Sequence, residues 1–473
     1  MKMFLGGQWV DKSEKIEVTN PFDQSVVDTV PKADAGDVEA AIAGAVEGAR
    51  IMRKMPAYQR FVILRKAADL INDRQEDLAQ TLSREEGKTL AEARGEANRT
   101  VQTFELSAEE AKRLGSEVLP LDAAPDCTDQ FGFTIRIPCG VVAAISPFNF
   151  PLNLVAHKLG PALAAGNAVV LKPASDTPLV ALKLVEILLE AGLPPLAISC
   201  VVGPGGQIGD AISTNRNVRK ITFTGSRDVG EHIVKMAGLK KVTMELGGNC
   251  PLIVADDANL EKAAQQTAVS GFINAGQVCI SAQRILVMDK VHDEFLELLK
   301  QRIEAITAGN QLDENTTMGP MIRETDAARV RQWVDEAVAD GAKLLTGGGR
   351  DGNLLEPILL ADVTPEMRVS REEIFGPAVG VTRCADFQQA LDLANDSQYG
   401  LGAAVFTQNL ARAMRFARQV DCGNLQINWG TAWRADLMPY GGLKQSGSGK
   451  EGPKYAVQEM TELKMVVMHG LKG

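Results

Sequence analysis

The sequence predicts an α/β protein in which a doubly wound, Rossmann-like domain is joined to a second α/β domain. Short apolar runs separated by helical segments occur at residues 141–145, 168–171, 199–202, 220–223 and 242–246. Such alternation is typical of a parallel sheet covered by helices on both faces. The alternation restarts after residue 248, and 473 residues exceed what a single core supports. We therefore expect two such domains.

The residues before this alternation are expected to add strands and helices around the first sheet. Residues 1–31 contain short apolar runs broken by prolines, which predicts strands at a sheet edge. Apolar side chains at helical spacing predict amphipathic helices from Asp37, over 57–72 and over about 90–114. Residues 131–137 alternate apolar and polar side chains and predict a further strand.

The second domain is expected to follow the same pattern as the first. A strand at 252–254 and a helix at 259–275 lead to a loop that contains Cys279 and then to a strand at 285–288. Later apolar runs occur at 378–381, 403–406 and 425–427. Residues 461–468 predict a terminal strand for which their own domain offers no obvious partner.

Composition excludes several classes of protein. The net charge of -10 speaks against nucleic acid or an anionic membrane surface as a partner. The first residues lack the apolar core of a signal peptide, and no run approaches a membrane span in length. Seven scattered cysteines without metal-type spacing fit a reducing cytoplasm and predict no metal site.

Cys279 is the candidate nucleophile. It lies in a loop after Gly276 and ahead of an apolar run that predicts a buried strand. A free cysteine alone more commonly fills a core. Three companion motifs outweigh that interpretation, namely SPFNFP (146–151), MELGG (244–248) and EEIFGP (372–377).

Together with GQVC (276–279), these motifs resemble those of the aldehyde dehydrogenase superfamily over essentially the whole chain. The most similar members in character are non-acylating lactaldehyde, semialdehyde and non-phosphorylating glyceraldehyde-phosphate dehydrogenases. The resemblance implies a homodimer or homotetramer. It also implies a cofactor-binding domain (1–117 and 139–246), an oligomerisation hairpin (118–138), a catalytic domain (247–446) and a carboxyl-terminal segment with an oligomerisation strand (447–473).

The chemistry expected of such a protein needs three residues. The Cys279 thiolate would add to an aldehyde carbon, giving a thiohemiacetal and then an acyl thioester. The Asn149 amide and the Cys279 N–H would donate to the oxyanion. Glu245 would activate the water that releases the acid, although most glutamates are simply solvated.

A dinucleotide is the expected cofactor. The glycine pattern GPGGQIG (203–209) is weak alone, because its spacing is one residue longer than the dinucleotide fingerprint. A second strand-to-helix turn, FTGS (223–226), strengthens the prediction. The cofactor residues that the resemblance implies are Ile145, Ser146, Pro147, Lys172, Ser175, Gly205, Gly209, Phe223, Gly225, Ser226, Val229, Leu246, Glu373 and Phe375.

Position 175 bears on the choice between NAD and NADP. Relatives that require NAD often have a carboxylate there, which repels the 2′-phosphate of NADP. Ser175 lacks that charge, and Lys172 is a possible phosphate partner, so we expect NADP or the use of both cofactors. Alternatively, Ser175 caps the following helix.

The substrate is expected to be a small hydroxylated or acidic aldehyde. Residues expected along the substrate tunnel are Phe148, Leu152, Ile280, Ser281, Trp429, Trp433 and Arg434, with Arg99 and His157 as further cationic candidates. The arginines are equally expected to be solvated or ion-paired, and His157 to be a packing residue. The segment 439–452 also resembles the family and receives no catalytic role.

Two other functions compete with a hydrolytic dehydrogenase. A CoA-acylating relative would transfer the acyl group to CoA, but it has no use for a water-activating base such as Glu245. A catalytically inactive homologue kept for binding or structure is the other alternative. It finds no support, because every chemical component is present.

Overall fold

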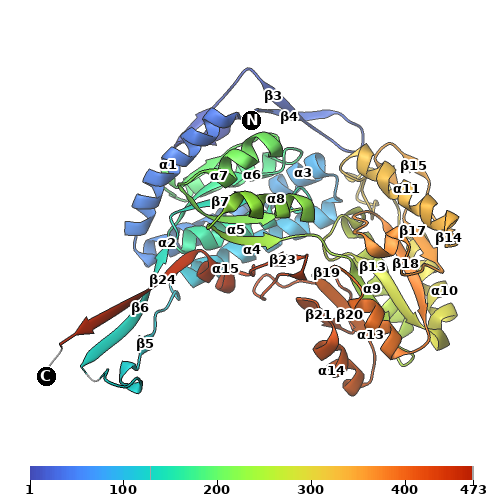
Figure 1. The fold of residues 1–473 in the computed structure, drawn as a ribbon. Coiled ribbons are helices and arrows are strands. Elements are labelled where there is room, and N and C mark those ends of the chain that lie inside the picture. The colour runs from blue at the N-terminus through green and yellow to red at the C-terminus, as the bar shows by residue number, and fades with distance from the viewer. Residues whose placement is uncertain (128, 471–473) are drawn as a thin grey trace.

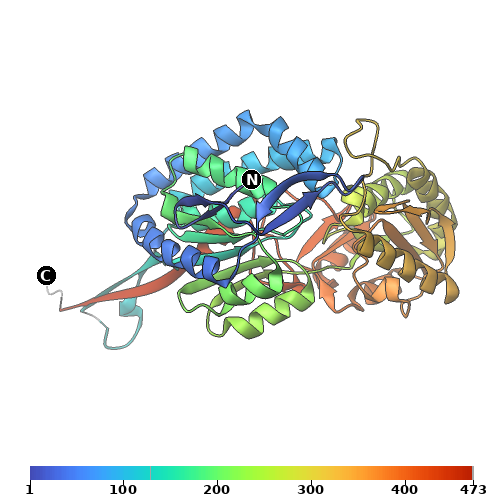
Figure 2. The same cartoon turned by 90° about the horizontal axis from the view of Figure 1, so that it is seen from above.

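The computed structural model describes residues 1–127 and 129–470. Two lobes lie side by side, and a thin arm of strands projects from the first lobe (Figure 1). Seen from above, the arm points away from the second lobe (Figure 2). Both lobes are built on sheets of mainly parallel strands, as the sequence predicts.

The first lobe contains an eight-stranded sheet in the order β2-β1-β9-β8-β7-β10-β11-β23. Its five central strands are parallel, and the direction of the strand order reverses between β7 and β10. Ligands of doubly wound sheets bind at the carboxyl ends of the strands beside such a reversal. The strands are β1 (Met3–Leu5), β2 (Gln8–Val10), β7 (Val141–Ile145), β8 (Ala168–Lys172), β9 (Ile198–Cys200), β10 (Val218–Thr224), β11 (Lys241–Glu245) and β23 (Gly447–Ser448).

Helices cover both faces of this sheet. They are α1 (Ala35–Lys54), α2 (Ala57–Asp73), α3 (Gln75–Glu86), α4 (Leu90–Ala111), α5 (Asn153–Ala164), α6 (Leu179–Glu190), α7 (Asp210–Thr214), α8 (Arg227–Ala237) and α15 (Pro453–Glu459). Alternate residues of a strand point to opposite faces. Ala143 of β7 accordingly packs in the core with α1, α7 and α8, whereas Val142 and Ala144 pack in the core with α2 to α6. The doubly wound prediction is confirmed.

Helix α3 was not expected from the sequence. Its buried face includes Glu85 and Glu86 beside Leu78 and Leu82, so the apolar stripe that reveals an amphipathic helix is interrupted by charge. Helix α4 begins with a capping box and ends at Ala111 rather than near residue 114.

The second lobe contains a seven-stranded sheet in the order β14-β17-β18-β13-β12-β20-β21. All its strands are parallel except β14 at one edge. The strands are β12 (Cys250–Val254), β13 (Ala282–Met288), β14 (Lys343–Thr346), β17 (Ile358–Ala361), β18 (Ala378–Cys384), β20 (Gly402–Phe406) and β21 (Asn424–Ile427).

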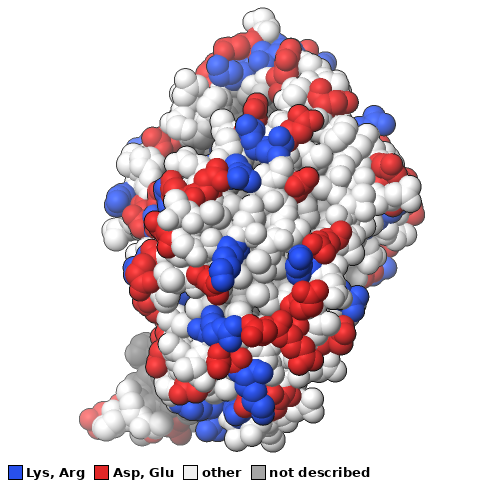
Figure 3. All heavy atoms as spheres, turned by 90° about the vertical axis from the view of Figure 1, so that its right-hand side faces the viewer, with Lys and Arg blue, Asp and Glu red and all other residues white. Residues whose placement is uncertain are grey.

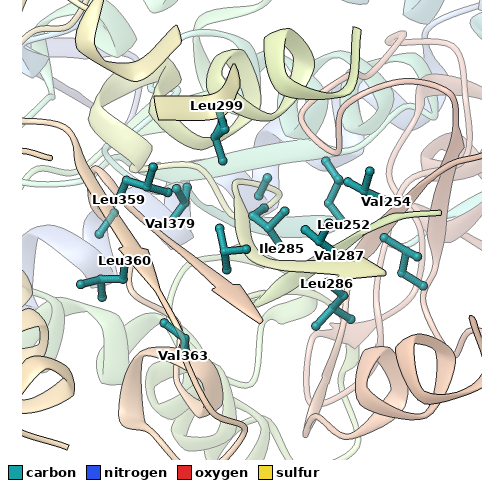
Figure 4. Packing of buried hydrophobic residues seen from close by; sticks show 14 of the residues in the cluster. Leu252, Val254, Ile285, Leu286, Val287, Leu299, Leu359, Leu360, Val363 and Val379 are labelled. Atoms are coloured by element: carbon teal, nitrogen blue, oxygen red, sulfur yellow. The ribbon is translucent and has the colours of Figure 1, made fainter. Parts of the chain in front are cut away.

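The helices of the second lobe are α9 (Leu260–Phe272), α10 (His292–Glu304), α11 (Glu324–Ala339), α12 (Arg368–Arg371), α13 (Phe387–Asn395) and α14 (Leu410–Gln419). One continuous apolar core joins them to the sheet. Leu252 and Ile285 of the central strands lie in it close to Leu299 of α10 (Figure 4).

Three short strand pairs lie outside the two large sheets. They are β3 (Lys15–Thr19) with β4 (Val26–Pro31), β15 (Arg350–Asp351) with β16 (Leu354–Leu355), and β19 (Tyr399–Gly400) with β22 (Leu443–Lys444). The surface on the side of α10 and β14 carries interspersed acidic and basic side chains (Figure 3). None of the helices in the described parts of the chain is long and apolar enough to cross a membrane.

The arm is a three-stranded sheet of β5 (Val118–Leu119), β6 (Gln130–Pro138) and β24 (Thr461–His469). Strand β24 pairs with β6 along its whole length, from Thr461 opposite Pro138 to His469 opposite Gln130. The terminal strand was expected to have no obvious partner in its own domain, and its partner is β6, in the 118–138 segment that the family resemblance groups with it. The partner is distant in sequence, which a search within one domain does not reveal.

The two lobes meet where strands of the first sheet end and strands of the second begin. Strand β11 ends at Glu245 and β12 begins at Cys250, so one short connection joins the sheets. The segment after β7 contacts the loop before β13, and the loop before β18 contacts residue 248. Side chains from four such segments can therefore converge on one site.

Candidate active site

Cys279 lies in a loop with an unusual backbone, just before β13. Asn274, Ala275 and Gly276 are all in the left-handed region, with φ of +50°, +52° and +69°. This conformation is costly for residues other than glycine and persists only where the surroundings enforce it. Here the Asn274 side chain is fixed, because its Nδ2 donates to Glu86 (2.8 Å) and to the Asn149 carbonyl (3.1 Å).

The surroundings of the Cys279 sulfur are mostly apolar. The residue is partly exposed and packs against a small buried cluster of Cys250, Val278, Ile280, Leu401 and Tyr440. Burial raises the pKa of the Cys279 thiol to about 12, and a hydrogen bond from Tyr440 opposes that rise. The Tyr440 hydroxyl lies 3.2 Å from Cys279 Sγ.

Asn149 reaches the same loop from the first lobe. Its Nδ2 donates to the Gln277 carbonyl at 2.7 Å, two residues before the cysteine. An amide nitrogen has two hydrogens, so one remains for a ligand. The Asn149 carbonyl accepts from Lys88 Nζ at 2.7 Å, which fixes the turn from behind.

Lys88 belongs to a fully buried polar network between α3, α4 and α5. Its ammonium donates to Glu96 Oε2 at 2.6 Å, and Glu96 Oε1 accepts the N–H groups of Leu152 and Asn153 at 2.9 Å each. A buried charge is tolerated only when it is paired and hydrogen-bonded. Because the network connects the Asn149 turn to the start of α5, it holds the predicted oxyanion donor in place.

Glu245 lies at the end of β11 and is buried. Neither carboxyl oxygen has a hydrogen-bond partner among the described residues. Burial raises the pKa of Glu245 well above its ordinary value, and the nearby Glu451 raises it further. Space for the carboxyl depends on Gly441, where an added Cβ would lie 2.7 Å from Glu245 Oε1.

Glu451 is equally buried but fully paired. It accepts from Lys158 Nζ at 3.2 Å and from Arg434 at 3.2 Å. Burial alone would raise its pKa, but Lys158 and Arg434 lower the pKa of Glu451 to about 2. Arg434 also lies over the Tyr440 ring, 3.9 Å from its centre.

The three cationic residues expected near the substrate lie close to one carboxylate, Asp436. Arg99 donates to both of its oxygens, at 2.8 and 3.1 Å, and His157 Nε2 lies 2.8 Å from Asp436 Oδ1. Arg434 Nη2 is 3.3 Å from His157 Nε2. Burial lowers the pKa of His157, and Arg434 lowers it further. Arg99 stays 31% exposed and is thus the most accessible of the three.

Glu373 lies close to the backbone of the β11–β12 connection. Its Oε1 accepts the Gly248 N–H at 2.9 Å, and an added Cβ on Gly247 would lie 2.3 Å from Oε2. Burial raises the pKa of Glu373 to about 7. Beside it, the rings of Phe148 and Phe375 are perpendicular, with centres 5.8 Å apart.

Several features at the strand ends of the first sheet fit a dinucleotide. The buried Ser146 hydroxyl has no partner among the described residues, and the buried Lys172 ammonium has only a 3.4 Å contact with the Pro173 carbonyl. Burial lowers the pKa of Lys172 to about 8. Added Cβ atoms on Gly205 and Gly209 would meet only open space, so a ligand can approach this backbone.

Ser175 does not cap the helix after it. Its hydroxyl donates to the Gly203 carbonyl at 2.9 Å, and helix α6 has no side-chain cap. The first N–H groups of α6, on Leu179 and Val180, donate instead to the Glu85 carboxylate.

The other residues expected along the substrate tunnel have different surroundings. Leu152 is part of the apolar core of the first lobe. The Ser281 hydroxyl donates to the Gly271 carbonyl at 3.3 Å. Trp429 is 40% exposed, and the centre of its ring lies 5.0 Å from Lys262 Nζ. Trp433 is 51% exposed.

Sequence reasoning missed the polar groups that support the site. The segment 439–452 received no catalytic role, yet it contributes Tyr440 and Glu451. Lys88 and Asp436 were not considered either. The sequence offered only a weak signal for Tyr440, namely that tyrosine is rare, with four in the chain, and that one of the four lies in this segment.

Comparisons with known proteins match both the sequence and the fold of the chain. The model of the Aldehyde dehydrogenase family matches residues 9–466. The 3-sulfolactaldehyde dehydrogenase of Priestia aryabhattai is 47% identical over 467 residues, covering 99% of this chain and 98% of the relative.

Two solved structures are similar throughout. Aldehyde dehydrogenase 21 from Physcomitrella patens, in complex with the reaction product succinate, has a TM-score of 0.97 and 41% identity, covering 99% of this chain and 98% of that one. Glyceraldehyde-3-phosphate dehydrogenase from Methanocaldococcus jannaschii, complexed with NADP, has a TM-score of 0.94 and 38% identity, covering 98% of this chain and 100% of that one.

Proposed function

The chain belongs to the aldehyde dehydrogenase family, and from this we propose that it oxidises a small hydroxylated or acidic aldehyde to the acid with NADP or NAD. One observation carries the hydrolytic part of this proposal. The buried Glu245 carboxyl has no hydrogen-bond partner within residues 1–127 and 129–470, and it is close enough to Cys279 to raise the pKa of the thiol. A group in that condition is suited to take a proton from water.

The first step forms a bond between the Cys279 sulfur and the aldehyde carbon. The carbonyl oxygen becomes an oxyanion, and the free N–H of Asn149 and the Cys279 N–H stabilise it. Lys88 supports this step by fixing the Asn149 turn through its 2.7 Å bond to the carbonyl. When bound, the nicotinamide supplies the acceptor for the hydride that leaves the adduct.

The second step releases the acid from the Cys279 thioester. Glu245 accepts a proton from water, and the resulting hydroxide adds to the thioester carbon. The raised pKa of Glu245 makes its carboxylate a stronger base once it is ionised. Collapse of the resulting tetrahedral adduct breaks the carbon–sulfur bond, Cys279 leaves as the thiolate, and Glu245 passes its proton to solvent before the next cycle.

Cofactor residues from both lobes support this assignment. Glu373 and Phe375 are proposed to hold the nicotinamide end, and Ser146, Lys172 and Ser175 the remainder. Ser175 carries no charge that would repel a 2′-phosphate, so NADP or both cofactors are proposed. The related glyceraldehyde-3-phosphate dehydrogenase was solved with NADP.

An anionic or hydroxylated substrate is proposed from two cations of one polar network, of which Arg434 is close enough to lower the pKa of Cys279. Arg99 is partly exposed, and Arg434 lies between Glu451 and the Tyr440 ring. Two relatives act on such molecules: one is named for sulfolactaldehyde, and the other was solved with succinate as its product. Arg99 and Arg434 are therefore the proposed partners of the group remote from the aldehyde.

We also propose a homodimer or homotetramer in the cytoplasm. The arm strand β24 exposes Leu463, Met465 and Val467, which a second copy of the chain would cover. All seven cysteines are free, which suits a reducing compartment. Sedimentation that gives only monomer at micromolar concentration would contradict the assembly.

One experiment tests the function. Acid formation is measured with lactaldehyde, sulfolactaldehyde, succinate semialdehyde and glyceraldehyde 3-phosphate, using NADP and NAD in parallel. We expect acid with at least one of them and none from Cys279→Ala, whose cofactor binding should persist. Acid formation that requires CoA would favour the acylating alternative, and oxidation by Cys279→Ala near the wild-type rate would refute the mechanism.

A further inference from the structure

Tyr440 is the only described residue whose side chain is hydrogen-bonded to the Cys279 sulfur. The two atoms are 3.2 Å apart, and the ring is buried in the same apolar cluster as the cysteine. The Tyr440 backbone is fixed as well, because residues 440 and 451 exchange N–H···O bonds of 3.2 and 2.7 Å. The hydroxyl therefore has a defined position against the sulfur.

We infer that Tyr440 is a further catalytic residue, whose hydroxyl donates to the Cys279 thiolate and stabilises it before and after each covalent step. This inference rests on the proposed function, in which Cys279 is the nucleophile. It adds a group that touches the reacting atom to the roles given to Asn149 and Glu245.

The direction of the hydrogen bond follows from charge. A thiolate has no hydrogen, so the tyrosine must donate once the sulfur ionises. Burial raises the pKa of Tyr440 well above its ordinary value, with Cys279 raising it further, so the hydroxyl keeps its proton at neutral pH. The phenol is thus a lasting donor to the sulfur.

The other charged groups facing the sulfur do not provide this donor. Glu373 and Glu245 both raise the pKa of Cys279, since a second negative charge opposes the thiolate. Arg434 lowers it but is paired with Glu451 and lies over the Tyr440 ring. The positive charge of Arg434 over the ring makes the Tyr440 hydroxyl a better hydrogen-bond donor. Both residues therefore lower the pKa of Cys279.

The test measures the alkylation of Cys279 by iodoacetamide across a range of pH, using the full-length protein without aldehyde or cofactor. Tyr440→Phe removes only the hydroxyl and keeps the ring that packs beneath Arg434. Loss of a hydrogen bond to a charged group should raise the alkylation pKa by about one unit. At neutral pH, alkylation of Tyr440→Phe should be about tenfold slower, and kcat/KM should fall with it.

Tyr455→Phe is the matched control. Tyr455 lies on α15, and losing its hydroxyl should leave the alkylation profile unchanged. Tyr440→Leu removes both the hydroxyl and the ring, so comparing it with Tyr440→Phe distinguishes the hydrogen bond from the packing of the ring. If Tyr440→Phe behaves as the wild type and only Tyr440→Leu loses activity, the ring acts by packing and the inference is overturned.

The same experiment separates this inference from the proposed function. Mass spectrometry of the alkylated peptide, with Cys279→Ser as a blank, identifies the thiol that reacts. If Cys279→Ser still oxidises aldehydes near the wild-type rate, the proposed mechanism with Cys279 as nucleophile fails, whatever Tyr440 does. If Cys279 is required but the alkylation profile is the same in wild type and Tyr440→Phe, only the role of Tyr440 fails.

Discussion

Two buried carboxyl groups of the candidate site, Glu245 and Glu451, are in opposite electrostatic situations. Glu451 is bound by Lys158 and Arg434, and its pKa is lowered to about 2. In the part of the chain that the structure describes, Glu245 has no hydrogen-bond partner for either oxygen, and its pKa is raised well above the ordinary value. Burial does not explain the difference, since it raises the pKa of both; the cations Lys158 and Arg434 reverse that effect at Glu451.

The difference between them separates structural from chemical carboxyl groups. A paired carboxylate compensates buried cations, so its removal should mainly affect stability. An unpaired one costs folding free energy and is kept where a reaction uses it. The following predictions test this contrast, beginning with the largest expected effect.

Glu245→Gln should arrest turnover after the thioester has formed. Steady-state acid formation should fall by about 10²- to 10⁴-fold, because an amide cannot accept the proton from water. Rapid mixing should still show release of one equivalent of reduced cofactor per site at nearly the wild-type rate. Loss of that first turnover, with no acyl-enzyme in the mass spectrum, would show that Glu245 acts earlier.

Glu451→Gln should lower the free energy of unfolding more than Glu245→Gln does. It leaves the buried cations Lys158 and Arg434 without their shared anion, which costs about 3–5 kcal/mol of unfolding free energy. Denaturant unfolding of both variants provides the comparison. Equal stability losses for the two would remove the distinction between a paired and an unpaired carboxyl group.

Stability should depend on pH in opposite senses through the two groups. The folded pKa of Glu245 is raised, so above the unfolded value near 4.5 the native state binds more protons. Its contribution therefore destabilises the fold as pH rises, by about 1.4 kcal/mol per unit until the folded pKa is reached. The folded pKa of Glu451 is lowered, so its contribution is present above about 4.5 and is lost as pH falls toward 2.

The Glu245 limb of this pH dependence is accessible to experiment. Thermal unfolding of the wild type and Glu245→Gln is compared between pH 5 and 8, a window above the unfolded pKa. The advantage of the variant should grow with pH across the lower part of that window. A constant difference would mean that Glu245 ionises in the folded protein as it does in water.

A carboxylate introduced at position 175, in the proposed cofactor site, should have only a small effect on cofactor choice. Ser175→Glu should weaken the use of NADP by about tenfold or less, because a solvated charge acts across water. The ratio of kcat/KM for NADP and NAD measures the change. A wild type already selective for NAD, or an unchanged NADP value in the variant, would show that position 175 does not select the cofactor.

Sequence reasoning succeeded where function depends on segments with a fixed pattern. The short apolar strands around Val142 and Ile285 identified both sheets, because burial on both faces leaves an uninterrupted apolar run. Helix α3 escaped the same reasoning because Glu85 and Glu86 occupy its buried face. Those carboxylates make sense only through Leu179, Val180 and Asn274, which lie far away in the chain.

The candidate site shows the same limit. Cys279, Asn149 and Glu245 could be named because each lies in a compact motif whose resemblance is specific. Arg99 and His157 could be named but not assigned, since their partner Asp436 lies far away in the sequence. The hydroxyl of Tyr440 against the sulfur depends on a fold that brings the end of the chain to its centre.

The return of the chain end to the first lobe also sets the order in which the protein can be made. Strand β23 completes the first sheet, α15 packs against α4 and α5, and β24 pairs with β6. All three follow the second lobe in the sequence, so the first lobe is completed only after the second lobe has been synthesised. The second lobe, between β12 and β21, is continuous in sequence and can fold before it. Until β24 has been synthesised and has paired with β6, one edge of β6 stays unpaired. An unpaired strand edge can pair with another chain, so this stage of synthesis is prone to aggregation.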